Sequence, residues 1–298
     1  MEHSPKSLDP RTLAKIKGLR LRTKQIVEGL LSGLHRSPFR GFSIEFSEHR
    51  EYVPGDDLRH VDWKAVARTD KFYLKQFEDE TSLICYLIVD ASESMQFQGP
   101  GQKSGGLSKF EFAQCLAASL AWLVLQQHDS VGLATFSDQV GDVIPPSSQA
   151  AQLQNIIGVL ESTKPDNPTQ SGPVFRRLAE RFSKRGIVFI LSDMFDDLES
   201  ALSGLQRLRY QRHQVVVLQT LDPAELEFPY DRSMLFRGLE GQGSHRADPR
   251  TIRTAYLEEL SRFQRRLQSA CQTSGIRHHL IRTDHAIDQV IGRLLTDR

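Results

Sequence analysis

The sequence is poor in cysteine, in net charge and in long apolar runs, and each of these shortages excludes a class of protein. Its three cysteines, Cys85, Cys115 and Cys271, form no CxxC pair, so a disulfide framework or a zinc ribbon is not expected. Cys85 and Cys115 lie in apolar patterns typical of small buried residues in a reducing compartment. Because the formal net charge is only +1, the composition gives no argument for nucleic acid as the main partner.

No apolar run approaches the roughly 18 residues that a bilayer-spanning helix requires, and the amino terminus shows no apolar signal region. We therefore expect a cytoplasmic location and no insertion into a membrane. Sequence motifs of common enzyme classes are missing too, since there is no Walker A, GxSxG or HExxH pattern. The balance of 39% hydrophobic and 25% charged residues is that of a globular protein.

The most apolar stretch of the chain runs directly into a group of oxygen-bearing side chains. Residues 83–89 are almost wholly apolar, which predicts a strand buried on both faces at the centre of a parallel sheet. Asp90, Ser92 and Ser94 follow at alternating positions, so an extended or turning backbone can direct three oxygens toward one point. Such ligands suit Mg²⁺, Mn²⁺ or Ca²⁺ better than Zn²⁺. The same residues are also typical of a turn or a helix N-cap, so this motif alone leaves both interpretations open.

Strand and helix patterns alternate along the rest of the chain. Strands are expected at residues 131–136, 140–144, 186–191, 213–219 and 276–281, and helices at 110–127, 149–160, 174–182, 198–209, 249–273 and 286–295. This alternation predicts an α/β protein with a doubly wound, mostly parallel sheet. Residues 221–246 interrupt the rhythm and predict a surface excursion with a hairpin near 234–241.

A different pattern precedes the central strand. A basic helix is expected over residues 10–34, followed by a small, highly charged unit with strands near 42–46 and 71–77 and a helix over 58–69. We therefore expect two parts, residues 1–80 with this helix and β-containing unit, and residues 81–298 with the sheet. Ordinary ion pairs on solvated faces explain most of the charge in the first part.

Doubly wound sheets bind ligands beyond the carboxyl ends of their strands, where the strand order reverses. Two strands of this sequence end in carboxylates, at Asp90 and Asp193, and the loop over residues 165–172 contributes Thr169. Together with Ser92 and Ser94, these residues can fill five positions of an octahedron, some through water, and leave one position open. The joint pattern is much more specific than the first motif alone.

Asp90-x-Ser92-x-Ser94, a downstream threonine and Asp193 resemble the metal-ion-dependent adhesion site of von Willebrand factor A domains. The segment PGDDLRHVDWKAVART, residues 54–69, is similar to the signature of a bacterial family called domain of unknown function 58. The resemblance implies an A-type domain in which Asp90, Ser92, Ser94 and Asp193 are metal ligands. It also implies a threonine ligand, either Thr169 or, because residues 166–168 replace the usual glycine-rich approach, Thr163.

The resemblance further implies function by binding, because the cation of an A domain accepts a carboxylate from a partner protein at its open position. Family members are associated with MoxR-type AAA+ ATPases, so the expected role is an adaptor in the assembly or maturation of other proteins. The alternative is a Mg²⁺-dependent phosphoester hydrolase that uses the same site. Nucleic-acid binding through the basic amino-terminal helix is a third interpretation, which the near-neutral charge disfavours.

Overall fold

The computed structural model describes residues 10–15, 17–34, 50–51, 73–74, 83–100, 106–238 and 243–296. Contacts divide the chain into two compact units, one formed by residues 1–33 with 83–298 and the other by residues 34–82. The described residues of the amino-terminal segment therefore group with the sheet. In the second unit, strand β1 (Arg50–Glu51) pairs antiparallel with β2 (Tyr73–Leu74). The expected strand at 42–46 and helix over 58–69 lie outside the described residues.

The main sheet has six strands in the order β10-β7-β6-β3-β4-β5. All neighbours are parallel except β4 and β5, which pair antiparallel. The strands are β3 (Ile84–Asp90), β4 (Ser130–Phe136), β5 (Val140–Ser147), β6 (Ile187–Ser192), β7 (Gln214–Leu221) and β10 (Arg277–Arg282). Numbered along the chain within the sheet, the order is 6-5-4-1-2-3, a doubly wound arrangement whose direction reverses between β3 and β6. The predicted fold class is confirmed, and the topology is consistent with a von Willebrand factor A-like fold.

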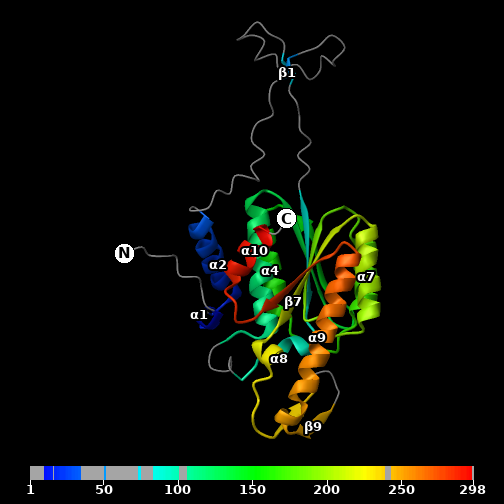
Figure 1. The fold of residues 1–298 in the computed structure, drawn as a ribbon. Coiled ribbons are helices and arrows are strands. Elements are labelled where there is room, and N and C mark those ends of the chain that lie inside the picture. The colour runs from blue at the N-terminus through cyan, green and yellow to red at the C-terminus, as the bar shows by residue number, and fades with distance from the viewer. Residues whose placement is uncertain are drawn as a thin grey trace. The chain divides into compact units, whose positions relative to one another are not determined.

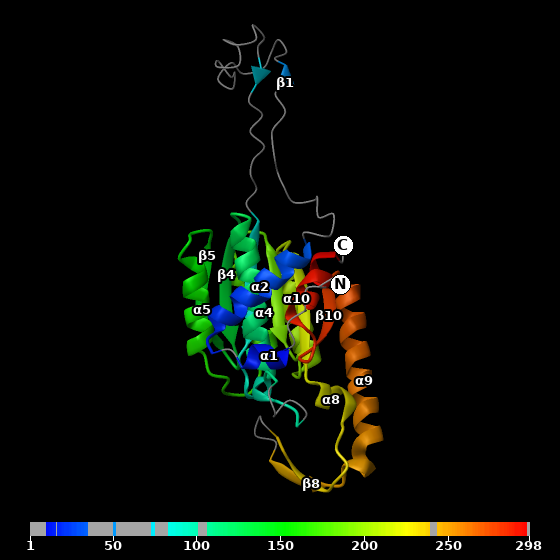
Figure 2. The same ribbon diagram turned by 90° about the vertical axis from the view of Figure 1, so that its left-hand side faces the viewer.

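Helices cover both faces of the sheet (Figures 1 and 2). They are α4 (Lys109–Gln126), α5 (Gln152–Ser162), α6 (Ser171–Arg181), α7 (Leu198–Tyr210), α9 (Pro249–Thr273) and α10 (Ile287–Thr296). In Figure 1, α4 and α10 lie on one face and α7 and α9 on the other. The core on the second face includes Phe175, Leu205 and Leu267, which are fully buried. No helix of the described segments has the length and apolar character needed to cross a bilayer.

The amino-terminal helix differs from its prediction, because the single helix expected over residues 10–34 is broken into α1 (Pro10–Ala14) and α2 (Leu19–Leu34). Gly18, directly before α2, has φ of +87°, a left-handed conformation that is incompatible with one continuous helix through this position. The backbone N–H of Leu19 then donates a hydrogen bond of 2.7 Å to the carboxylate of Glu161 at the end of α5. Ile26 on α2 is fully buried, so this helix is part of the packed sheet unit.

Close contact between α6 and α7 depends on two glycines that face each other. A Cβ atom at Gly204 would come within 2.8 Å of the backbone oxygen of Gly172, and one at Gly172 would overlap Ser200. The two helices therefore approach more closely than alanine at either position would allow.

The excursion after β7 contains the short helix α8 (Pro223–Glu227) and a hairpin of β8 (Met234–Arg237) and β9 (Ser244–Ala247). The hairpin is confirmed, although its second strand begins three residues beyond the expected range. Because β7 is parallel to β3, the excursion starts at the same end of the sheet as Asp90. Figure 1 shows the hairpin extending beyond that end, beside the first turns of α9.

Candidate metal site

The two acidic strand ends lie side by side, because β3 and β6 are neighbours at the point where the strand order reverses. Asp90 is the last residue of β3, and Asp193 directly follows β6. Val89 pairs with Leu191 in the parallel register, so Asp90 and Ser192 occupy the next pair of positions. The sheet thus brings the two carboxylates together, as the strand patterns predicted.

Asp90 is fully buried, and both of its carboxylate oxygens accept hydrogen bonds. Oδ1 accepts from the backbone N–H of Ser92 at 2.9 Å, and Oδ2 accepts from the hydroxyl of Ser192 at 2.5 Å. Burial and the negative charge of Asp193 raise the pKa of Asp90 to about 7, and the hydrogen bonds oppose this shift only in part. Burial and Asp193 therefore disfavour the ionised form of Asp90.

The first loop of the site follows β3 and carries Ser92 and Ser94 at the start of a short 3-10 helix, Glu93–Gln96. The Ser92 hydroxyl is fully buried, and its oxygen lies 3.1 Å from the Ser94 oxygen. Adjacent ligands on an octahedral Mg²⁺ with bonds of about 2.1 Å lie about 3 Å apart. The spacing of the two hydroxyl oxygens therefore matches two neighbouring positions around such an ion.

The loop after α5 lies against this first loop through backbone hydrogen bonds. The N–H of Asp166 donates to the carbonyl of Ala91, and the N–H of Glu93 donates to the carbonyl of Asn167, both at 2.9 Å. Thr169 follows in this loop and is buried, with 6% of its surface exposed. The fallback candidate, Thr163, instead donates its hydroxyl to the carbonyl of Val159 in the last turn of α5. The structure thus places Thr169 in the loop that lies against the loop of Ser92 and Ser94. Its role as a metal ligand stays a prediction.

Asp193 is also fully buried, and it forms an ion pair that the sequence patterns did not predict. Its Oδ2 lies 2.7 Å from Nζ of Lys109, and its Oδ1 accepts from the N–H of Phe195 at 3.0 Å. Lys109 contacts Oε1 of Glu225 on α8 as well, again at 2.7 Å. Burial disfavours the charged form of Lys109, but the two carboxylates outweigh it and raise its pKa above the ordinary value. Lys109 therefore joins the excursion after β7 to the candidate site.

One sequence signal could have identified Lys109. The pattern Ser108-x-x-Glu111 is a capping box, and both of its reciprocal hydrogen bonds are present in the structure. This motif places Lys109 in the first turn of α4, where the helix dipole disfavours a positive charge. A carboxylate beside the lysine would offset this effect, although the sequence does not indicate which one.

The charges and donors of the site fit a divalent cation of the Mg²⁺ type. When all groups are ionised, Asp90, Asp193 and Glu225 carry three negative charges against one positive charge on Lys109, a surplus of two. The donors are carboxylate and hydroxyl oxygens, which are hard ligands. Within the described segments, no three His, Cys, Asp or Glu side chains lie close enough together to hold a metal ion. A cation at this site would therefore depend on the hydroxyl oxygens beside the two strand-end carboxylates.

Fold and site together define a doubly wound α/β protein with paired carboxylates at its topological switch point. The chain belongs to the family described as protein of unknown function DUF58, whose model matches residues 48–266. Two uncharacterized mycobacterial proteins, Rv1480 of Mycobacterium tuberculosis and Mb1516 of Mycobacterium bovis, are each 28% identical to it over 227 residues. In both cases the match covers 74% of this chain and 68% of the relative.

Solved structures with a similar arrangement include an aerotolerance-related membrane protein from Bacteroides fragilis and the conserved hypothetical protein BatB from Bacteroides thetaiotaomicron. Each is 18% identical to this chain, with TM-scores of 0.49 and 0.46. In both comparisons the match covers 72% of this chain and all of the other chain.

Proposed function

We propose that this protein is a metal-dependent protein-interaction module. A Mg²⁺ ion, or Mn²⁺ or Ca²⁺ in its place, is held by Asp90, Ser92, Ser94, Thr169 and Asp193, and its open position accepts an Asp or Glu carboxylate of a partner protein. The observation that carries the proposal is the buried pair of acidic strand ends, Asp90 and Asp193, beside two hydroxyl oxygens spaced 3.1 Å apart. When bound, the cation supplies a positive charge that attracts the carboxylate of the partner.

The residues of the chain itself have three tasks in this function. The hydrogen bonds from Ser192 and from the backbone of Ser92 fix the orientation of the Asp90 carboxylate. Lys109 holds one oxygen of Asp193 and thereby fixes the position of the second carboxylate. Ser94 and Glu93 are only partly buried, so the site opens to solvent, and to a partner, beside the first loop.

The resemblance to the family supports a MoxR-type AAA+ ATPase as a partner and a cytoplasmic role in assembling or maturing other proteins. The test is binding of a purified ATPase of this type to the wild-type protein, to Asp90→Asn and to the control Asp231→Asn, each in Mg²⁺ and in chelator. We expect capture by the wild type and the control in Mg²⁺ only, and none by Asp90→Asn. Equal capture in chelator would contradict a role of the metal in this interaction.

The hydrolase alternative predicts a different outcome in the same preparations. Metal-dependent turnover of generic phosphoesters that disappears in Asp193→Ala would favour the enzyme, and the absence of turnover in a protein that binds Mg²⁺ favours the interaction module.

A further inference from the structure

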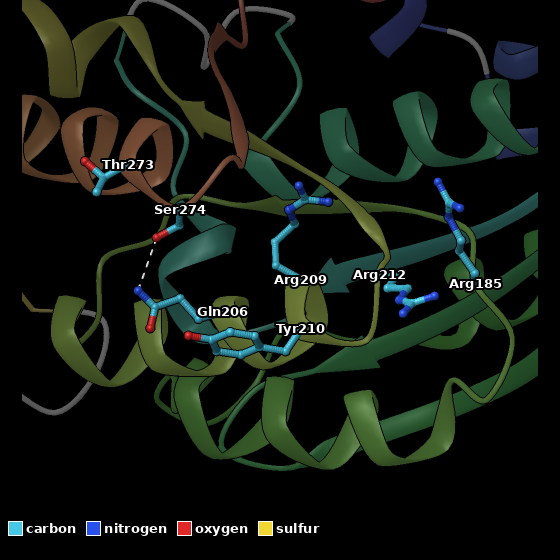
Figure 3. A pocket seen from close by; sticks show the side chains of 7 residues that line it. All are labelled: Arg185, Gln206, Arg209, Tyr210, Arg212, Thr273 and Ser274. Atoms are coloured by element: carbon cyan, nitrogen blue, oxygen red, sulfur yellow. Dashed lines mark hydrogen bonds between the residues drawn. The ribbon is translucent and has the colours of Figure 1, made fainter.

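A pocket lies at the amino ends of the parallel strands, at the opposite end of the sheet from the candidate metal site. It has a volume of about 590 Å³, and seven residues line it: Arg185, Gln206, Arg209, Tyr210, Arg212, Thr273 and Ser274 (Figure 3). Three lining residues precede the parallel strands β6, β7 and β10 by two or three positions: Arg185, Arg212 and Ser274. The pocket therefore faces the amino ends of these strands, whereas Asp90 and Asp193 lie at the carboxyl ends. The six residues of β6 separate the two ends by about 20 Å.

The lining of this pocket is rich in hydrogen-bond donors and contains no carboxylate. None of the three arginines forms an ion pair with any residue of the described segments. Arg185 and Arg212 are exposed, while Arg209 is partly buried and donates one hydrogen bond of 2.8 Å to the carbonyl of His213. Most of the guanidinium donors are therefore available to a ligand.

Part of this positive charge is explained by the helices that end at the pocket. The carboxyl ends of α7 and α9 each carry roughly half a negative charge from their backbone dipoles. Two such ends offset about one of the three positive charges. About two positive charges remain, a surplus that a dianion such as a phosphate ester neutralises.

On one side of the pocket, near Arg209, a hydrogen bond joins the ends of α7 and α9. Gln206 on α7 donates a hydrogen bond of 3.1 Å to the hydroxyl oxygen of Ser274 after α9, which joins the two helix ends and leaves the Ser274 hydrogen available (Figure 3). Gly275 has φ of +65°, and a Cβ atom there would lie 3.3 Å from the Arg209 guanidinium. Because glycine has no Cβ atom, the guanidinium of Arg209 fits beside this turn.

We propose that this pocket binds a small organic phosphate that carries a planar ring. Arg185, Arg209 and Arg212 bind the phosphate oxygens, because the planar guanidinium fork matches them in pairs. The volume of the pocket exceeds what a phosphate group alone requires. Tyr210, with 80% of its surface exposed at the rim, offers its face to the ring.

The test is calorimetric titration of the full chain in chelator with ADP, pyrophosphate and adenosine. We expect saturable binding of ADP and pyrophosphate and none of adenosine. Arg185→Gln and Arg212→Asn should each weaken ADP binding at least tenfold. Neither side chain forms an ion pair with the described residues, so neither substitution breaks one there. Asparagine is chosen at position 212 because its φ is +66°, which asparagine tolerates.

Arg207→Gln is the matched control, because Arg207 lies in the last turn of α7, as Arg209 does, but does not line the pocket. Arg207→Gln should change the affinity for ADP less than twofold. An effect as large as that of Arg212→Asn would mean that ADP binds through the general positive charge of this surface and not through the pocket. Tyr210→Ala should weaken ADP more than pyrophosphate, and equal weakening would contradict the ring contact. The proposal is overturned if neither phosphate compound binds in the millimolar range, or if a hexaglutamate peptide or oligothymidylate binds more tightly than ADP.

Discussion

Nζ of Lys109 lies 2.7 Å from Oδ2 of Asp193, so a fully buried ion pair connects the first turn of α4 with the residue that follows β6. The same ammonium group contacts Glu225 on α8 at 2.7 Å. One lysine therefore fixes a candidate metal ligand and the start of the excursion after β7. Breaking such a buried pair by removing one partner leaves an uncompensated charge, which is strongly destabilising.

Lys109→Met should lower the free energy of unfolding by about 3–5 kcal/mol, because two buried carboxylates lose their counter-charge. Urea unfolding monitored by circular dichroism measures this loss. Lys24→Met is the control, because Lys24 forms an exposed i,i+4 pair with Glu28. This substitution should change the free energy of unfolding by less than about 0.5 kcal/mol. Mg²⁺ should stabilise Lys109→Met more than the wild type, and a variant as stable as the control would contradict the buried network.

The close packing of α6 against α7 can be tested by comparing substitutions at two glycines. Gly172→Ala should destabilise the protein by about 1–3 kcal/mol, because the added methyl group overlaps Ser200. Gly158→Ala in α5 is the matched substitution, since a Cβ atom there meets nothing within 4 Å. It should stabilise the protein by about 0.5–1 kcal/mol through the better helix propensity of alanine. Thermal unfolding of both variants measures these effects. A shift of the unfolding temperature in the same direction in both variants would contradict this account.

Docking of α2 onto the sheet unit can be tested at its buried face. Ile26→Ala should cost about 2–5 kcal/mol, because Ile26 is fully buried and its truncation leaves a cavity. Leu31 lies on the same helix with 44% of its surface exposed, and Leu31→Ala should have little effect. Chemical unfolding compares the two variants, and equal small effects would mean that α2 does not contribute to the core.

Acid should destabilise the protein through His278 on β10. Burial and the neighbouring His279 lower the pKa of His278 to about 4, from an ordinary value of 6.5. Between these values the unfolded chain binds a proton that the folded chain does not, so stability is complete above about pH 6.5 and falls toward pH 4. His278→Gln should reduce this dependence. The control is His128→Asn, because His128 is exposed and asparagine tolerates its φ of +61°. Unfolding free energies measured from pH 4 to 8 provide the test.

Several elements could be predicted from sequence because their signals are local. The strand that ends in Asp90 and the helix over residues 249–273 appear at their expected places, since apolar runs and helix periodicity depend only on nearby residues. The expected strand over 140–144 is longer in the structure and continues through Pro145 and Pro146 to Ser147. It lies at the edge of the sheet, where proline is tolerated because one side of the strand needs no ladder hydrogen bond.

Other features depend on contacts between distant residues and could not be predicted in this way. The ion pair of Lys109 joins residues 84 positions apart, and no local pattern identifies its partner. The break at Gly18 is similar, because the N–H of Leu19 is satisfied by Glu161, 142 residues further along the chain. Asp90 and Asp193 could be paired from sequence only because the topology of doubly wound sheets places strand ends side by side.

The central claim is that Asp90 and Asp193 hold a divalent cation, and calorimetric titration of the metal-stripped protein with Mg²⁺ and Mn²⁺ tests it most directly. The account predicts one site in the wild type and in the exposed control Asp231→Asn, and no detectable binding in Asp90→Asn. Circular dichroism of Asp90→Asn should show an intact fold, because the substitution keeps the shape of a side chain whose charge is disfavoured by burial. Binding of equal strength in all three proteins, or absence of binding in the wild type, would contradict the claim.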